Sequence, residues 1–262
     1  IILAFLQGIT EFLPISSSGH LAILEYFFGI TETDLVTVAL HAGTLLSIIL
    51  FYRAKIFKIL LSQNLIRIAF IFFVGSIPAG IVGLIINKYD IDTMLASSLI
   101  VPGTGLIITS AFLFSFRSDS MQSLKNMEEM TFKNAFVIGI SQALAITPGI
   151  SRSGTTITTA LSYGYNGEDS ANFSFFLAIP AIAGATLLKL LKYVKLDQNG
   201  IRVNIDSFSL LVGFAIAAVT GYISLVILVK ILQGRRLHVF APYCLILGVL
   251  VFLFAIVNEL FY

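Results

Sequence analysis

The sequence predicts an all-α polytopic membrane protein with about six full transmembrane helices and two re-entrant helical hairpins, arranged as inverted-topology repeats. The first observation is composition: 57% of the residues are hydrophobic, 11% are charged, and the mean hydropathy is +0.97. A soluble domain carries roughly 25% charged residues, so this surface suits a bilayer better than water. The second observation is that two apolar regions, 1–30 and 134–163, are each interrupted by a short polar break. A net charge of +2 gives no indication of nucleic-acid binding.

The first hairpin is predicted from the length of its two apolar halves. Residues 1–13 are apolar apart from Gln7, Thr10 and Glu11, and Pro14 ends them. As a helix they would reach only about 20 Å, short of the roughly 30 Å hydrocarbon core. A second short apolar run, 21–30, follows the break. Because irregular backbone at membrane depth must be buried in protein or line a wet cavity, the break is expected inside the protein.

Full spans are expected between the hairpins and after the second one. The first three alternate across the membrane, so the two hairpins should enter from opposite faces, an arrangement that transporters commonly use. We expect one integral membrane domain over 1–262, with repeat 1 at about 1–116 and repeat 2 at about 132–262. The predicted spans are 35–52, 68–86, 94–116, 171–193, 208–231 and 239–257.

Basic residues predict which loops face the cytoplasm. Between residues 52 and 67 the chain carries four basic residues and no acidic one, and the positive-inside rule makes this loop cytoplasmic. The polar segment 117–133 and the pair Arg235 and Arg236 fall on the same side. A group of lysines on the predicted outer side runs against the rule: Lys189, Lys192 and Lys195.

The two polar breaks resemble each other in sequence. Residues 7–20 and 142–156 can be laid over one another without a gap, and Arg152 then occupies the position of Ser17. The matched pairs are Gln7 with Gln142, Ser16 with Ser151, Ser18 with Ser153, and Gly19 with Gly154.

Arg152 is the most costly residue of the second break. An arginine at membrane depth costs at least ~2.5 kcal/mol, so it needs an anionic partner. That partner is either Glu11, in a structural ion pair, or a bound anion. Ser151, Ser153 and Thr156 add hydroxyl donors, and a helix that begins after the break would aim its positive dipole end at the same point. This set of donors suits phosphate.

The first break carries the remaining candidates for chemistry. Glu11 is an anion counterpart, a metal ligand, a base, or only the partner of Arg152. His20 suits the role of base, acid or nucleophile, and Ser17 is the alternative nucleophile, with His20 or Glu11 as its base. Ser16 and Ser18 are expected both to satisfy backbone groups and to contact a ligand. His41, inside the first full span, is expected to be structural. The residues alone therefore predict a buried oxyanion site that either hydrolyses or only binds.

The two breaks closely resemble the signatures of the bacterial undecaprenyl-diphosphate phosphatase family, also called the bacitracin-resistance family. An (E/Q)xxxE motif followed by L-P-x-S-S-x-G-H corresponds to Gln7, Glu11 and residues 13–20, and P-G-x-S-R-S-x-x-T corresponds to 148–156. The likeness extends to L-H-x-G-T around His41 and covers essentially the whole chain. One departure is Gln7, which stands where the motif also allows Glu and cannot act as a base.

The resemblance implies an integral membrane hydrolase that converts undecaprenyl diphosphate to undecaprenyl phosphate and inorganic phosphate. This reaction would recycle the lipid carrier for peptidoglycan synthesis and confer resistance to bacitracin. It further implies a divalent cation, Mg²⁺ or Ca²⁺, held by Glu11 with help from Gln7. Arg152, Ser151, Ser153 and Thr156 would hold the phosphates, and Ser17, His20 or a water activated by His20 would attack.

We expect the enzyme in the bacterial cytoplasmic membrane, with its active site facing the outer, periplasmic side. The bilayer and the lipid substrate are the expected partners. A homodimer is compatible with the sequence, which does not fix the oligomeric state. The rival function is a polyprenyl-phosphate transporter or flippase, because inverted repeats with half-length helices at the midplane are typical of carriers.

Overall fold

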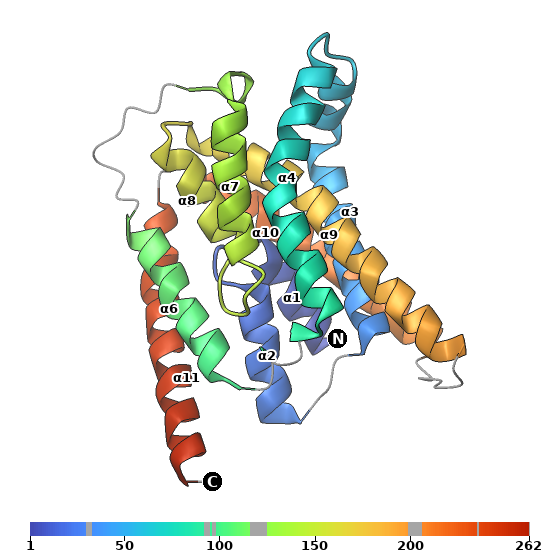
Figure 1. The fold of residues 1–262 in the computed structure, drawn as a ribbon, viewed down its shortest axis with the longest axis vertical. Helices are drawn as coiled ribbons and strands as arrows, with labels where there is room; N and C mark the ends of the chain where they lie inside the picture. The colour runs from blue at the N-terminus through green and yellow to red at the C-terminus, as the bar shows by residue number, and fades with distance from the viewer. Residues whose placement is uncertain are drawn as a thin grey trace.

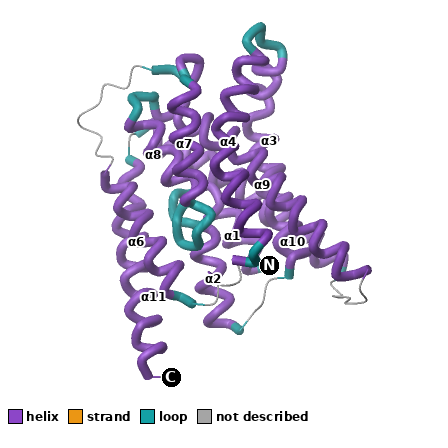
Figure 2. Tube along the Cα trace, viewed as in Figure 1, coloured by secondary structure: helices purple, strands orange, loops and turns teal. Residues whose placement is uncertain are grey.

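A computed structural model describes residues 1–29, 33–91, 95, 98–115, 125–198, 206–234 and 236–261, and the regular elements among them are helices (Figures 1 and 2). In chain order these are α1 (Ile2–Phe12), α2 (Ser17–Phe28), α3 (Asp34–Leu60), α4 (Leu65–Lys88), α6 (Ile100–Ser115), the 3₁₀ turn η1 (Met127–Glu129), α7 (Phe132–Leu144), α8 (Arg152–Ser162), α9 (Gly167–Gln198), α10 (Ser207–Gln233), the 3₁₀ turn η2 (Leu237–Phe240) and α11 (Ala241–Phe261).

Five of these helices are long and apolar enough to cross a membrane: α3, α4, α9, α10, and η2 continued by α11. Their outer faces carry exposed apolar side chains, such as Ile66, Phe73 and Leu250. In water these side chains would be a large unfavourable surface, whereas lipid tails solvate them well. The chain is therefore a multi-pass membrane protein, as the composition predicted.

Three predicted spans differ from the helices in length. The span expected at 94–116 contains the helix α6, which has 16 residues, and 94, 96–97 and 116 lie outside the described part of the chain. Helix α3 continues past the expected end at 52 as far as Leu60, so the basic residues Arg53, Lys55 and Lys58 belong to a helix and not to a loop. Lysine and arginine are good helix formers, so a charge ends the apolar segment without ending the helix. Helix α9 likewise extends past the expected end at 193, through Lys195 to Gln198.

Ion pairs tie charged residues together at both ends of the bundle. Lys55 contacts Glu168 at 2.6 Å, and Lys192 contacts Asp90 at 3.0 Å. Both pairs are exposed, so each contributes little to stability. The pairing of Lys192 does reduce the excess positive charge that was noted on the predicted outer side. Of the other polar segments, 116–124, 199–205 and Arg235 lie outside the described residues.

The first polar break is a tight turn between α1 and α2. Pro14 lies just after α1, and Ser16 takes a left-handed φ of 70° that reverses the chain. The Ser16 side chain then caps α2 by accepting a hydrogen bond from the Gly19 backbone N–H at 3.2 Å. This bond satisfies one of the free N–H groups at the helix start, which cannot reach water here.

The second polar break repeats this device between α7 and α8. Ser151 caps α8 by accepting from the Gly154 backbone N–H at 3.1 Å. Ser16 and Ser151, and likewise Gly19 and Gly154, are the pairs that the sequence overlay matched. In Figure 1 the pair α7 and α8 opens toward the top of the view, whereas α2 descends from the centre to the lower edge. The two breaks thus approach each other from opposite ends of the bundle.

Close backbone contacts hold the two breaks together in the interior. A Cβ on Gly19 would lie 2.9 Å from Gly149 Cα, so the breaks touch at their glycines. Thr109 of α6 fixes the second break because its hydroxyl accepts from the Ser151 N–H at 2.8 Å and donates to the Gly149 carbonyl at 2.9 Å. Gly149 has a φ of 88°, and a Cβ there would lie 2.2 Å from the Pro102 carbonyl oxygen. Only glycine fits this position.

Replacing Gly149 by alanine should destabilise the fold strongly. The new methyl group combines an unfavourable φ with overlap against backbone, and together these should lower the free energy of unfolding by about 3 kcal/mol or more. Thermal unfolding in detergent would measure the loss. Gly80→Ala is the matched control, since nothing lies within 4 Å of a Cβ at Gly80. Equal melting temperatures for the two variants would contradict the packing described here.

Candidate functional site

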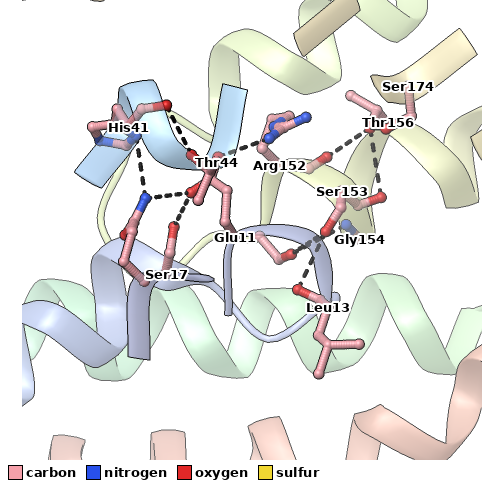
Figure 3. A network of polar contacts seen from close by, with 12 residues as sticks. Glu11, Leu13, Ser17, His41, Thr44, Arg152, Ser153, Gly154, Thr156 and Ser174 are labelled. Atoms are coloured by element: carbon pink, nitrogen blue, oxygen red, sulfur yellow. Dashed lines mark hydrogen bonds and ion pairs between the residues drawn. The ribbon is translucent and has the colours of Figure 1, made fainter. Parts of the chain in front are cut away.

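A buried ion pair connects the two breaks. Glu11 lies in the last turn of α1, and Arg152 is the first residue of α8, 141 positions further along the chain. Arg152 Nη2 donates to Glu11 Oε1 at 2.8 Å, and the side chains are 15% and 7% exposed. Figure 3 shows the two side chains meeting from the two breaks. The ion pair that the sequence offered as the structural alternative is therefore present.

Arg152 also keeps a donor for another partner. Its second terminal nitrogen, Nη1, is buried and has no hydrogen-bond partner. Buried donors in proteins are almost always satisfied, so a buried guanidinium nitrogen without a partner indicates a place for an acceptor. Ion pairing and anion binding thus use different nitrogens of Arg152, and the two predicted roles are compatible.

The second oxygen of Glu11 collects two further donors. Ser17, the first residue of α2, donates its hydroxyl to Glu11 Oε2 at 2.7 Å. Gln7, one turn before Glu11 on α1, donates to the same oxygen at 3.0 Å. A short hydrogen bond from a hydroxyl to a carboxylate is charge-assisted, and it is the geometry in which a carboxylate can take the proton of a nucleophile.

His41 joins this cluster, although the sequence analysis treated it as structural. Its Nδ1 lies 3.2 Å from Gln7 Nε2, and its backbone carbonyl accepts the hydroxyl of Thr44 at 3.0 Å. Because Gln7 Nε2 is a donor, Nδ1 is the acceptor. The available signal was an ionisable residue in the middle of a span, which by default indicates a functional position.

His20 lies elsewhere. Its Nδ1 donates to the Ser16 carbonyl at 2.7 Å, so in the neutral ring Nε2 accepts from the Tyr243 hydroxyl, also at 2.7 Å. The rings of His20 and Tyr243 are stacked, with centroids 5.7 Å apart. The structure therefore joins His20 to α11 and places neither Ser17 nor Glu11 within its hydrogen bonds. Nothing in the sequence indicated Tyr243, which is 223 positions away.

The remaining predicted hydroxyls act mostly as structural donors and acceptors. The hydroxyls of Ser16 and Ser18 lie 3.3 Å apart, and those of Ser151 and Ser153 lie 3.3 Å apart, which repeats one arrangement in both breaks. Thr156 is fully buried, bonds to the Ser174 hydroxyl at 2.6 Å and donates to the Arg152 backbone carbonyl at 2.7 Å, so its hydroxyl is engaged within the first turn of α8 and with α9. Ser18 is the exposed member of the set.

The cluster can bind an anion and activate a hydroxyl, but it offers few ligands for a metal ion. The described residues contain no group of three or more His, Cys, Asp or Glu side chains that could hold an ion. Glu11 is already bonded through both oxygens, but the carbonyl oxygen Oε1 of Gln7 is buried without a partner. A hard cation that takes most of its ligands from a phosphate and water would need only one or two protein oxygens, such as Gln7 Oε1.

Comparison with known proteins places the chain among polyprenyl phosphatases. The family described as "Bacitracin resistance protein BacA" matches residues 1–250. The chain is 38% identical over 271 aligned positions to the undecaprenyl-diphosphatase of Desulforapulum autotrophicum, covering 95% of both proteins. It is 39% identical over 251 positions to undecaprenyl-diphosphatase 4 of Bacillus cereus, covering 95% of this chain and 94% of that protein. A similar likeness, 36% over 278 positions, holds for the enzyme of Methanosphaera stadtmanae.

A double-mutant cycle should detect the buried ion pair. Arg152→Gln leaves the Glu11 carboxylate buried without its counter-charge, so it should lower the free energy of unfolding by about 3–5 kcal/mol. Adding Glu11→Gln removes the uncompensated charge and should restore most of that loss. Thermal or denaturant unfolding in detergent measures the four proteins. Additive effects of the two substitutions would mean that the side chains do not interact.

Proposed function

This chain belongs to the bacitracin resistance protein BacA family, and on that premise we propose that it hydrolyses undecaprenyl diphosphate to undecaprenyl phosphate and inorganic phosphate. One structural observation carries the proposal. A hydroxyl, a carboxylate and a guanidinium with a free nitrogen meet at a single buried point, as Ser17, Glu11 and Arg152. A site that only carried a lipid phosphate would need the positive charge of Arg152. It would have no use for a hydroxyl hydrogen-bonded to a carboxylate.

The hydrogen bond from Ser17 to Glu11 supports Ser17 as the nucleophile. Ser17 Oγ attacks the terminal phosphorus while Glu11 Oε2 takes the hydroxyl proton, and the bond from that phosphorus to the bridging oxygen breaks. Undecaprenyl phosphate leaves with the bridging oxygen. The proton on Glu11 passes to the departing undecaprenyl phosphate, which makes Glu11 a base again. Water then attacks the phosphoserine while Glu11 takes one of its protons, the bond from Ser17 Oγ to phosphorus breaks, Oγ regains that proton, and inorganic phosphate leaves. His20, with both ring nitrogens engaged, is the weaker candidate for the attack.

Arg152 and the two helix starts stabilise the charge on the transferred phosphoryl group. The free Nη1 of Arg152 is a donor for a phosphate oxygen, and α2 and α8 both begin at the breaks and aim positive dipole ends there. Preorganised donors of this kind are the main source of catalysis in phosphoryl transfer. Ser151 and Ser153 hold the backbone at the start of α8, and we assign Ser18 and Ser16 the same task at α2.

We propose that a divalent cation, Mg²⁺ or Ca²⁺, binds together with the substrate. Gln7 Oε1, which lacks a partner, and Glu11 would hold it, and the diphosphate would supply most of its other ligands. The cation would neutralise charge on the phosphates.

The proposed architecture is a single domain of two inverted repeats, about 1–116 and 132–262, in which α1–α2 and α7–α8 are re-entrant hairpins. The matching serine caps and the opposite directions of the hairpins support it. By the positive-inside rule the first hairpin opens to the periplasmic side of the cytoplasmic membrane, so the diphosphate would enter from there. The product returns to peptidoglycan synthesis, and high activity would oppose bacitracin. A homodimer stays a prediction.

Phosphate release in detergent separates the enzyme from a transporter or flippase. A polyisoprenyl diphosphate with Mg²⁺ or Ca²⁺ should yield inorganic phosphate from the wild type, because hydrolysis needs no second compartment. Arg152→Ala should lower the rate by about 10³-fold or more, since it removes the main charge stabiliser. Lys55→Gln, which breaks only the exposed pair with Glu168, is the control and should keep full activity. No release from the folded wild type across several metals would favour the carrier.

A trapped intermediate would identify the nucleophile. Rapid acid quenching of the enzyme during turnover should give a phosphorylated Ser17 by mass spectrometry, and Ser17→Ala should abolish both the adduct and activity. Tyr243→Phe, which removes the hydroxyl bonded to His20, should leave the adduct in place. A phosphorylated His20, or no adduct under single-turnover conditions with full activity, would exclude attack by Ser17.

A further inference from the structure

Lys189 is a basic residue inside an apolar membrane-spanning helix, and the reaction described above does not use it. It lies on α9, within the candidate span Gly167–Lys195. Lys192, almost one turn further, pairs with Asp90 at 3.0 Å, whereas Lys189 has no carboxylate partner in the described part of the chain. A charge in a span without a counter-charge is costly and commonly marks a binding position for an ion or substrate.

The packing of α3 against α9 brings Lys189 near the site. The two helices run in opposite directions (Figure 1), and the ring of Tyr52 lies 5.1 Å from that of Phe176. His41 lies about three turns before Tyr52, and Lys189 lies between three and four turns beyond Phe176. Equal travel along antiparallel helices brings these segments opposite one another. Lys189 therefore lies beside the segment of α3 that carries His41.

Thr186 adds a second donor on the same face of α9. It precedes Lys189 by three positions, so the two side chains lie one above the other. Its hydroxyl is enclosed and has no hydrogen-bond partner. A buried hydroxyl without a partner is destabilising unless a ligand supplies the acceptor. An ammonium and a hydroxyl side by side are suited to the oxygens of a phosphate.

The negative charge of the substrate suggests what Thr186 and Lys189 bind. Glu11 and Arg152 neutralise each other, so apart from the proposed divalent cation the side chains between the breaks offer little net positive charge for a diphosphate. The terminal phosphate must lie at Ser17 and Arg152 to react. The second phosphate, which stays on the lipid, must lie within one bridging oxygen of it, on the side from which the lipid enters. Lys189 lies toward that side, because on α9 it follows Phe176, which contacts Tyr52, and precedes Lys192, which pairs with Asp90 at that end of the bundle.

We propose that Thr186 and Lys189 form a second phosphate subsite that holds the lipid-linked phosphate while the terminal phosphate reacts between the breaks. This inference rests on the proposed function. The subsite binds substrate and lipid product and does not touch the released inorganic phosphate. It also selects diphosphates over monophosphates, because a monophosphate can fill only one of the two positions.

Steady-state kinetics with farnesyl diphosphate in detergent tests the subsite. Lys189→Gln should raise KM about ten-fold and weaken inhibition by farnesyl phosphate about equally, since both molecules lose the same contact. Inhibition by inorganic phosphate should not change. Thr186→Val should raise KM about three-fold without lowering the melting temperature, because it removes a hydroxyl that has no partner in the free protein. Lys189→Arg should restore most of the affinity.

Lys192→Gln is the matched control, one turn away on the same helix, and its KM should stay within about two-fold of the wild type. If Lys189→Gln keeps the wild-type KM and the wild-type inhibition by farnesyl phosphate, Lys189 only extends toward the membrane surface and the proposal is wrong. If it weakens inhibition by inorganic phosphate as well, the residue serves the terminal phosphate instead, which also overturns the proposal. A wild type that releases no phosphate would refute the proposed function itself.

Discussion

The buried ion pair between Glu11 and Arg152 is the interaction on which the rest of the structure depends. Each charge alone would be expensive in an apolar interior, so neither break is stable there without the other. The pair thereby fixes the relative position of two chain segments 141 residues apart. It also leaves one nitrogen of Arg152 without a partner and directs Glu11 at Ser17. The same contact that stabilises the fold prepares the site for an anion.

The surrounding packing serves this contact by letting two irregular turns approach each other inside the bundle. Each turn satisfies its own backbone through a serine cap, and Thr109 bonds to both the N–H and the carbonyl groups of the second turn. Glycines at the contact allow the backbones to approach where any side chain would collide. Such close approach between small residues is how membrane helices gain contact when the hydrophobic effect between them is absent.

Much of this could be predicted because it is local in sequence. The half-length helices followed from their apolar lengths, and the overlay of the breaks matched Ser16 with Ser151, which the structure shows as equivalent caps. The cost of a buried arginine pointed to Glu11. The predicted end of α3 was wrong because the apolar segment ends before Arg53, whereas the residues that follow still favour a helix.

The contacts that escaped prediction depend on distant helices. The bond between His20 and Tyr243 joins α2 to α11, and Thr156 finds its partner Ser174 on α9. Neither residue type nor spacing indicates which of many hydroxyls comes close in the folded bundle. The partner of His41 escaped prediction for the same reason, since Gln7 lies on a different helix. A polar residue in an apolar segment predicts that it has a polar partner, but it does not identify that partner.

We expect the two breaks to hold the diphosphate together, with its terminal phosphate between Arg152 and Ser17. A structure with a bound polyprenyl methylene-diphosphonate, in which carbon replaces the bridging oxygen and blocks hydrolysis, tests it most directly. The terminal phosphonate should lie within hydrogen-bonding distance of Arg152 Nη1 and of Ser17 Oγ. A diphosphonate bound at the exposed ends of the bundle, with the pair between Glu11 and Arg152 undisturbed and Nη1 still without a partner, would contradict it.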